Sequence, residues 1–462
     1  MGHVSAAVLV NHAAKAADAP YFTPSMCDGR QRCDLFLIPK LAQSSPLNLS
    51  FSPSWRDEAK WNTAEDLVAL SKSSDNPNAS LQSFPSTTIS LEVAHDPIIL
   101  EDTTSSSTNG GNASRILLVS AMFPLSKSKH TPDEYAYWLS QFLQPITTDI
   151  YFFTTPEFAP VIERSRPDGL TITIDISYSS PFDVPPLKGL QNAYSKMHNQ
   201  DREKKIHAPE LYAIWNAKPF LLDSAVNILA KKGRVYDYAF WNDAGSFRRE
   251  HRYRDWPDAT RVKQIWRQGS EITDTKTEDL LFFPLTGLPA SKMKKWKEGM
   301  GPIDSEVSEG SFFGGSPKAI AWWSRTYYAY HNHYLSLGLF VGKDQTLINA
   351  LFLLFPSRII TVWYRDPLAP AHAGVIPYFD EGFLGACGSD WWYYQFWLAD
   401  RAVRDQMREM WAGWSKWAKW DWYRERQKCR LTGVQGMQDL LQRQFGSKWV
   451  PPGRAVIIQD TN

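Results

Sequence analysis

The strongest candidates for a binding or catalytic site are polar residues that follow a short apolar run. Tyr236–Trp241 has the length and aromatic content of a buried strand, and it stops at Asn242-Asp243-Ala244-Gly245. In α/β sheets, ligands bind outside the carboxyl ends of the strands, so an acid here is a candidate site residue. Its carboxylate could hold a hard divalent cation, which could in turn hold a diphosphate. The alternative is structural, with Asp243 capping the next helix and Gly245 making a turn.

A second block, Glu309–Asn349, repeats the combination of acids with small residues. Gly314 and Gly315 follow an apolar pair, and without a Cβ they let the backbone approach a ligand or another strand. Asp344 and Gln345 open a predicted helix, where the helix dipole also favours an acid. The block therefore offers both a candidate site and a purely structural interpretation.

Cations stand on both sides of the predicted strand. Asn216 and Lys218 lie in a predicted helix that precedes it, although a single lysine on a helix is usually solvated. Arg248 begins a cluster of basic residues that extends to Arg254. Guanidinium groups suit phosphate oxygens, so this cluster is either a lid over an anion or a solvated charged face.

Composition narrows the class of protein. The 462 residues contain 50 Lys plus Arg and 49 Asp plus Glu, which argues against a nucleic-acid binder with an overall basic field. Twenty Trp provide much buried surface for a core. The four cysteines fit neither a disulfide scaffold nor a paired zinc site. No apolar run reaches about eighteen residues, so no transmembrane segment is expected in this chain.

The elements that must position these residues begin near residue 115. Residues 1–114 are rich in Ser, Pro and Asn, and we expect a long disordered N-terminal tail there. Alternating strand and helix patterns follow, and they predict an α/β fold with a mostly parallel central sheet and flanking helices over residues 115–450. Tryptophans recurring every three residues predict a helical part at about 390–450 that serves packing or interaction.

The order of these blocks resembles the HtrL/YibB family, whose members are assigned as glycosyltransferases. The resemblance covers about residues 115 to 400 and is specific in the combination of its pieces. The matching segments are Ile116–Ala121, Pro209–Lys218 (PELYAIWNAK), Phe240–Gly245 (FWNDAG), Phe312–Pro317 (FFGGSP), Gly342–Asn349 (GKDQTLIN) and Cys387–Tyr394 (CGSDWWYY). The FFGGS block with the later acid is also similar, more distantly, to the acceptor-side block of blood-group type glycosyltransferases.

This resemblance implies a GT-A-like nucleotide-diphospho-sugar transferase fold with Mn²⁺ or Mg²⁺ on the donor diphosphate. By the resemblance Asp243 takes the metal-binding place, although Asn242 and Ala244 flank a single acid where the family type has D-x-D. Asp344 or Glu309 would position or deprotonate the acceptor hydroxyl. The expected donor-binding residues are Asn216, Lys218, Trp241, Asn242, Arg248, Gly314, Gly315 and Gln345.

The expected partners are a nucleotide-diphospho-sugar donor and a glycan, protein or lipid acceptor, without nucleic acid. The resemblance favours the secretory pathway or Golgi, but no signal or anchor is visible, and without one the cytoplasm is expected. Two other classes stay open. A non-catalytic binding or scaffold protein could keep the fold without the activity. A nucleotidyltransferase is disfavoured, because no Gly-rich phosphate loop follows the first predicted strand.

Overall fold

The computed structural model describes residues 5–7, 114–363, 366, 387–388, 391–413, 431 and 433–458. Most of the predicted N-terminal tail, and residues 414–430 of the predicted helical part at about 390–450, therefore lie outside the described residues. Within the tail, Ser5–Ala7 forms β1, which pairs antiparallel with β3 (Phe123–Leu125). The domain boundary predicted near residue 115 stays a prediction, although β2 begins at Ile116.

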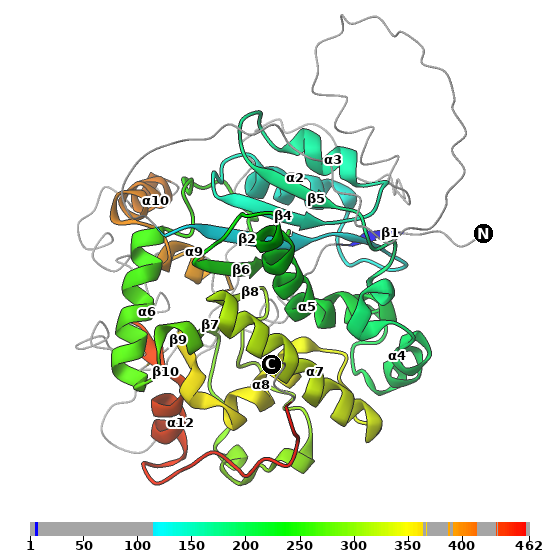
Figure 1. Ribbon diagram of the computed structural model, residues 1–462, viewed down its shortest axis with the longest axis vertical. Coiled ribbons are helices and arrows are strands. Elements are labelled where there is room, and N and C mark those ends of the chain that lie inside the picture. The colour runs from blue at the N-terminus through cyan, green and yellow to red at the C-terminus, as the bar shows by residue number, and fades with distance from the viewer. Residues whose placement is uncertain are drawn as a thin grey trace, which may run out of the picture. The chain divides into compact units, whose positions relative to one another are not determined.

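An eight-stranded mixed sheet is the centre of the described chain (Figure 1). Its order is β10-β9-β7-β8-β6-β2-β4-β5. Neighbours are parallel from β6 to β5 and between β7 and β9, whereas β8 runs antiparallel to β6 and β7, and β10 antiparallel to β9. The strands are β2 (Ile116–Ala121), β4 (Asp149–Phe153), β5 (Ile172–Asp175), β6 (Tyr238–Asn242), β7 (Leu281–Leu285), β8 (Phe312–Gly315), β9 (Ile359–Trp363) and β10 (Gln435–Gly436).

Helices cover both faces of this sheet, so the predicted α/β class with a mostly parallel sheet is confirmed. Apolar side chains form one cluster on each face of the sheet. In β2, Leu117 and Val119 belong to one cluster, and Leu118, between them, belongs to the cluster on the opposite face. A strand buried on both faces reads as a continuous apolar run, as β2 does. The helices are α2 (Pro132–Leu143), α3 (Ala159–Ser165), α4 (Gln191–Met197), α5 (Pro209–Lys231), α6 (Ala259–Thr273), α7 (Pro317–Ser336), α8 (Asp344–Leu354), α9 (Tyr393–Trp397), α10 (Arg401–Gly413) and α12 (Met437–Phe445).

Local sequence explains where the helices nearest the site begin. Ser316 caps α7 by accepting a hydrogen bond from Ala319 N, and Pro317 takes the first helical position, where its missing N–H costs nothing. In α8 the first helical residue is Asp344, whose negative charge suits the positive end of the helix dipole. α5 lies against β2 and β6 (Figure 1), and Lys218 is one of its buried residues.

The topology brings distant segments to one edge of the sheet. Asn242, the last residue of β6, lies opposite Phe312, the first residue of β8, because these strands are antiparallel. Residues 309–311, which precede β8, therefore lie beside Asp243, which follows β6. This is the carboxyl edge of the parallel strands, where α/β proteins bind their ligands.

Candidate functional site

Asp243 is completely buried just beyond the carboxyl end of β6. Its backbone N–H donates to the Ser311 carbonyl oxygen at 2.9 Å, and its Oδ1 accepts a 2.6 Å hydrogen bond from Trp241 Nε1. The other oxygen, Oδ2, is buried and has no hydrogen-bond partner among the described residues. A buried carboxylate oxygen in this state is suited to a cation that the protein itself does not supply.

Lys218 joins Asp243 to Asp344, and the three residues come from α5, β6 and α8. Its Nζ lies 3.4 Å from Asp243 Oδ1, 2.8 Å from Asp344 Oδ2 and 2.8 Å from the carbonyl oxygen of Gly310. The lysine side chain is 1% exposed, so its charge is almost fully removed from water. Burial alone would lower its pKa, but the charges of Asp243 and Asp344 outweigh burial and raise it.

Three buried carboxylates, those of Asp243, Asp344 and Glu309, lie at this site, and the pKa of Asp243 is raised. Burial raises this pKa to about 7, against the opposing effects of Lys218 and the Trp241 hydrogen bond. Asp344 and Glu309 raise it further through their negative charges. Glu309 is fully buried, and its Oε1 accepts a 3.3 Å hydrogen bond from the Ser311 N–H. The site therefore holds negative charge that a bound cation would neutralise.

Arg248 lies near this acidic cluster and is held by stacking. Its guanidinium carbon lies 4.2 Å from the ring centroid of Trp138 and 5.3 Å from that of Trp392, and Nε donates to the Gly245 carbonyl oxygen at 3.2 Å. Its Nη2 is buried without a hydrogen-bond partner among the described residues. Burial lowers the pKa of Arg248, whereas several nearby anionic groups, Asp243 and Glu309 among them, oppose that change.

The other arginines of the Arg248–Arg254 cluster follow the solvated interpretation, whereas His251 is buried. Arg249, Arg252 and Arg254 are exposed, and Arg252 pairs with Glu250 at 2.8 Å. The structure thus brings one arginine of the cluster into the site and leaves its other arginines at the surface.

Three predicted donor-binding residues use their polar groups within the protein. Asn216 donates to the carbonyl oxygens of Tyr212 and Val341, and it accepts a 2.6 Å hydrogen bond from the Tyr327 hydroxyl. These bonds fix α5 against the segment that leads into α8. Asn242 donates to the Asp243 carbonyl oxygen and accepts from the Ser246 hydroxyl. Gln345 Nε2 donates to the Ser308 carbonyl oxygen at 2.6 Å, which ties α8 to the segment before β8.

The two glycines of β8 lie between strands. A Cβ on Gly314 would come within 2.1 Å of the Ala239 carbonyl oxygen, and one on Gly315 within 2.6 Å of the Leu280 carbonyl oxygen. Of the two interpretations that the sequence left open, the geometry favours close approach of another strand. These glycines allow β8 to pack between β6 and β7.

A segment near the C-terminus covers the acidic cluster. The Tyr394 hydroxyl lies 3.2 Å from Ser311 Oγ, and Gln395 Nε2 donates to the Ser246 carbonyl oxygen at 3.0 Å. Trp256 Nε1 in turn donates to the Gln395 carbonyl oxygen. Trp391 and Trp392 belong to the same segment, and Trp392 stacks on Arg248. Nearby, the buried Cys387 is disulfide-bonded.

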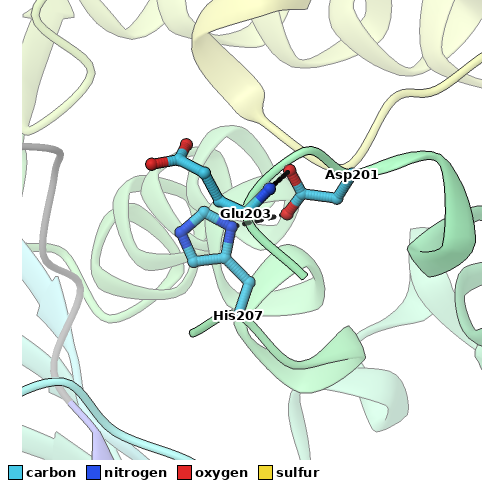
Figure 2. Close-up of side chains that lie close together, drawn as sticks. All are labelled: Asp201, Glu203 and His207. Atoms are coloured by element: carbon cyan, nitrogen blue, oxygen red, sulfur yellow. Dashed lines mark hydrogen bonds and ion pairs between the residues drawn. The ribbon is translucent and has the colours of Figure 1, made fainter. Parts of the chain in front are cut away.

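A second group of polar residues was not predicted from the sequence. Asp201, Glu203 and His207 lie close together before α5 (Figure 2), with one potential ligand atom from each within 4.8 Å of the others. This group could hold a metal ion. Its sequence signal is the short spacing of two acids and a histidine in DREKKIH, which is weak because such triplets are common.

Hydrogen bonds and an ion pair within the protein also satisfy this second group. His207 Nδ1 and the Tyr212 hydroxyl both contact Asp201 Oδ2 at 2.6 Å, and the Glu203 N–H donates to Oδ1. Glu203 forms a 2.6 Å ion pair with Lys343, the residue before Asp344. Burial would raise the pKa of Asp201, but the hydrogen bonds from His207, Tyr212 and the Glu203 N–H hold it well below its usual range. A metal here would compete with Lys343 for Glu203.

Comparison with known proteins does not identify the chain. No protein-family model matches it, and no curated protein matches its sequence. Among the described residues no helix combines the length and apolar character needed to cross a membrane.

Proposed function

We propose that the chain is a glycosyltransferase that moves a sugar from a nucleotide-diphospho-sugar to a hydroxyl acceptor. The observation that carries the proposal is a pair of buried, unsatisfied groups of opposite charge in one region. Asp243 Oδ2 and Arg248 Nη2 are buried, and neither has a hydrogen-bond partner among the described residues. A divalent metal bound to a diphosphate would satisfy both, because the metal suits the carboxylate and the phosphate suits the guanidinium.

The sheet supports the same proposal. The strands of this sheet from β2 to β9 can be numbered 1 to 7 along the chain, with β3 left out because it lies outside the sheet. Their order in space is then 3-2-1-4-6-5-7, and the sixth strand is antiparallel to both of its neighbours. Asp243 stands just beyond the carboxyl end of the fourth of these strands, at the edge where α/β proteins bind their ligands. Fold alone does not fix function, so the argument rests on the site and the sheet together.

In the proposed reaction the bond from the anomeric carbon to the diphosphate oxygen breaks, and a bond to the acceptor oxygen forms. The products are the glycosylated acceptor, a nucleoside diphosphate and a proton. Arg248 would bind the diphosphate and stabilise the negative charge that develops on it. Asp243 would hold Mn²⁺ or Mg²⁺, which supplies further charge stabilisation when bound.

The other carboxylates have separate roles in this proposal. Asp344 or Glu309 would orient the acceptor hydroxyl and take its proton. Lys218 acts as a positioning residue, because its Nζ already contacts Asp243, Asp344 and the Gly310 carbonyl oxygen. This departs from the direct contact with donor that the sequence suggested for Lys218, since its charge is engaged by protein groups.

One observation favours the alternative, a non-catalytic binding or scaffold protein. Lys218, Asp243 and Asp344 are almost completely buried and pair with one another. A closed ion cluster of this kind can serve the fold without chemistry. Donor binding therefore has to be measured before turnover is interpreted.

The test is calorimetric titration of the protein with UDP- and GDP-sugars, in Mn²⁺ and in EDTA. The proposal predicts that one donor binds in Mn²⁺ and that EDTA weakens the binding at least tenfold. Asp243→Asn should lose the Mn²⁺-dependent part, because a hard cation needs anionic oxygen ligands. His207→Ala is the matched control, since it removes a ligand from the Asp201 group and leaves Asp243 unchanged.

The outcomes separate the two candidate metal groups. Loss of the Mn²⁺ dependence in His207→Ala but not in Asp243→Asn would move the metal to the Asp201 group. Equal donor binding by wild-type protein in Mn²⁺ and EDTA would refute the metal role, and absence of binding to every donor would refute the proposed function. Circular dichroism has to show that each variant is folded, because Asp243 is part of a buried ion cluster.

A further inference from the structure

A surface rich in lysine lies apart from the acidic cluster. Its first part is residues 286–300, which contain Lys292, Lys294, Lys295 and Lys297, with the first three in the 3-10 helix η5 (Ser291–Lys295). Its second part is residues 446–458, which add Lys448 and Arg454. The two parts hold six cations, all exposed, and a single acid, Glu298. We call these two segments the lysine-rich surface.

Contacts between the two segments make them one surface. Gln444 Nε2, at the end of α12, donates to the Pro289 carbonyl oxygen at 2.8 Å, and Lys294 Nζ lies next to Gly446. Lysines of the first segment and residues 449–453 of the second line a common hollow of about 550 Å³. Lys294, Lys295 and Lys297 therefore lie together beside the second segment, and their charges add.

The single acid of this surface does not neutralise the lysines. Glu298 is buried, and its carboxylate accepts hydrogen bonds from the Tyr330 hydroxyl and from the N–H groups of Ala455 and Val456. Those bonds also fix the second segment against the first. Within the described part of the chain, none of the six cations forms an ion pair.

Exposed apolar side chains accompany the charge. Met300, Val450 and Ile457 are 61%, 69% and 84% exposed. They are three of the eight large apolar side chains that are exposed among the described residues, and all three lie in these two segments. The chain has a net charge of only +1, so a gathering of six cations with three apolar side chains is a local feature.

We propose that the lysine-rich surface binds the surface of an anionic membrane. Lysines near such a surface are attracted by its negative potential, while apolar side chains enter the boundary between head groups and acyl chains. A soluble polyanion would use the lysines but gain nothing from Met300, Val450 and Ile457. The exposed apolar side chains therefore favour a lipid surface as the partner. This inference goes beyond the proposed sugar transfer and does not depend on it.

The test is co-sedimentation of the full chain with vesicles of phosphatidylcholine alone and of phosphatidylcholine mixed with phosphatidylserine. We expect binding to the mixed vesicles, weakened by salt, and little binding to the neutral ones. Changing Lys294, Lys295 and Lys297 together to Gln should lower the partition coefficient on the order of 100-fold, at about fivefold for each cation. The matched control changes the exposed Lys188, Lys231 and Lys263 to Gln and should leave binding unchanged.

A second variant tests the choice of lipid over polyanion. Changing Met300, Val450 and Ile457 to Ser should reduce vesicle binding and leave retention on a heparin column as in wild type. Equal loss in the control variant, equal binding to neutral and anionic vesicles, or heparin retention without vesicle binding would each overturn the proposal. Unchanged thermal melting of the variants excludes unfolding as the cause, since all the substituted residues are exposed.

Discussion

Replacing Lys218 by Met tests how the acidic cluster is held together. Met keeps most of the side-chain volume and removes the ammonium, so Asp243 and Asp344 lose their shared cation. With an effective dielectric constant of about 20, the attraction is about 6 kcal/mol at 2.8 Å and about 5 kcal/mol at 3.4 Å. Burial of the three charges offsets much of this attraction, and removing one partner of a buried pair typically costs about 3–5 kcal/mol.

We therefore expect Lys218→Met to lower the free energy of unfolding by about 3–5 kcal/mol at neutral pH. Urea denaturation followed by circular dichroism measures this value. Lys343→Met is the matched control, because Lys343 forms one ion pair, at 2.6 Å, with the 38% exposed Glu203. Its loss should cost about 1 kcal/mol or less.

A second substitution distinguishes the lost ion pair from a packing defect. Asp344→Asn in the Lys218→Met background removes one of the two stranded carboxylates and should recover part of the stability. A loss below about 1 kcal/mol in Lys218→Met would refute the reasoning, because an uncompensated buried charge costs more than that. No recovery in the double variant would show that packing, and not charge, explains the loss.

Three further predictions concern the donor, the sheet and pH. Arg248→Lys should weaken donor binding about tenfold in calorimetry, because an ammonium group lacks the two parallel donors of a guanidinium group. Arg249→Lys, at the exposed neighbouring residue, should leave donor binding unchanged, and equal effects of the two variants would contradict the role of Arg248. Gly314→Ala should lower the free energy of unfolding by about 3 kcal/mol or more, since its Cβ would meet the Ala239 carbonyl oxygen. Gly299→Ala, whose Cβ would have nothing within 4 Å, should change it by less than about 0.5 kcal/mol, and similar values for the two variants would contradict the packing argument. Burial lowers the pKa of His331 from 6.5 to about 4, so the unfolded chain binds a proton at this residue first as the pH falls. The free energy of unfolding should therefore decrease between these two pKa values by about 1.4 kcal/mol per pH unit. His331→Gln should remove this contribution, and an unchanged slope in acid titration would contradict the prediction.

The sequence predicted the parts of the fold that local patterns encode. The apolar run of β6 predicted a buried strand, and the alternation of strand and helix patterns predicted the α/β class. Local sequence also explains the start of α2, where Thr131 and Glu134 form a capping box before Pro132 takes the first helical position. The strand β7 was not among the sequence predictions, and it contains Pro284, a residue that is uncommon within strands. β8 pairs with Leu281 and Phe282 of β7, and beyond them the Pro284 carbonyl oxygen accepts a hydrogen bond from the Glu309 N–H at 2.9 Å.

The candidate site could be predicted residue by residue but not as a set of contacts. The position of Asp243 at a strand end follows from local sequence, and the structure brings Lys218, Glu309 and Asp344 beside it. Their convergence depends on the antiparallel pairing of β8 with β6, which no local pattern encodes. The ion pairs of Lys218 could not be predicted, because a lysine on a helix is usually solvated and only tertiary packing buries it.

The interpretation of β8 changed for the same reason. Gly314 and Gly315 were compatible with a ligand or with a strand, and sequence could not decide between them. Backbone atoms of Ala239 and Leu280 occupy the space beside them. The Asp201 group was not predicted, because only the tertiary structure brings Asp201 and Glu203 into contact with Tyr212 and Lys343.

The most direct test of the proposed function is release of nucleoside diphosphate from a panel of nucleotide-sugars. In this assay water replaces the acceptor, so the acceptor need not be known. We predict that the wild-type protein releases UDP or GDP from one donor in Mn²⁺, and that EDTA or Asp243→Asn abolishes the release while the protein stays folded. Folded wild-type protein that releases no nucleoside diphosphate from any donor, or that releases it equally in EDTA and in the Asp243→Asn variant, would contradict the account.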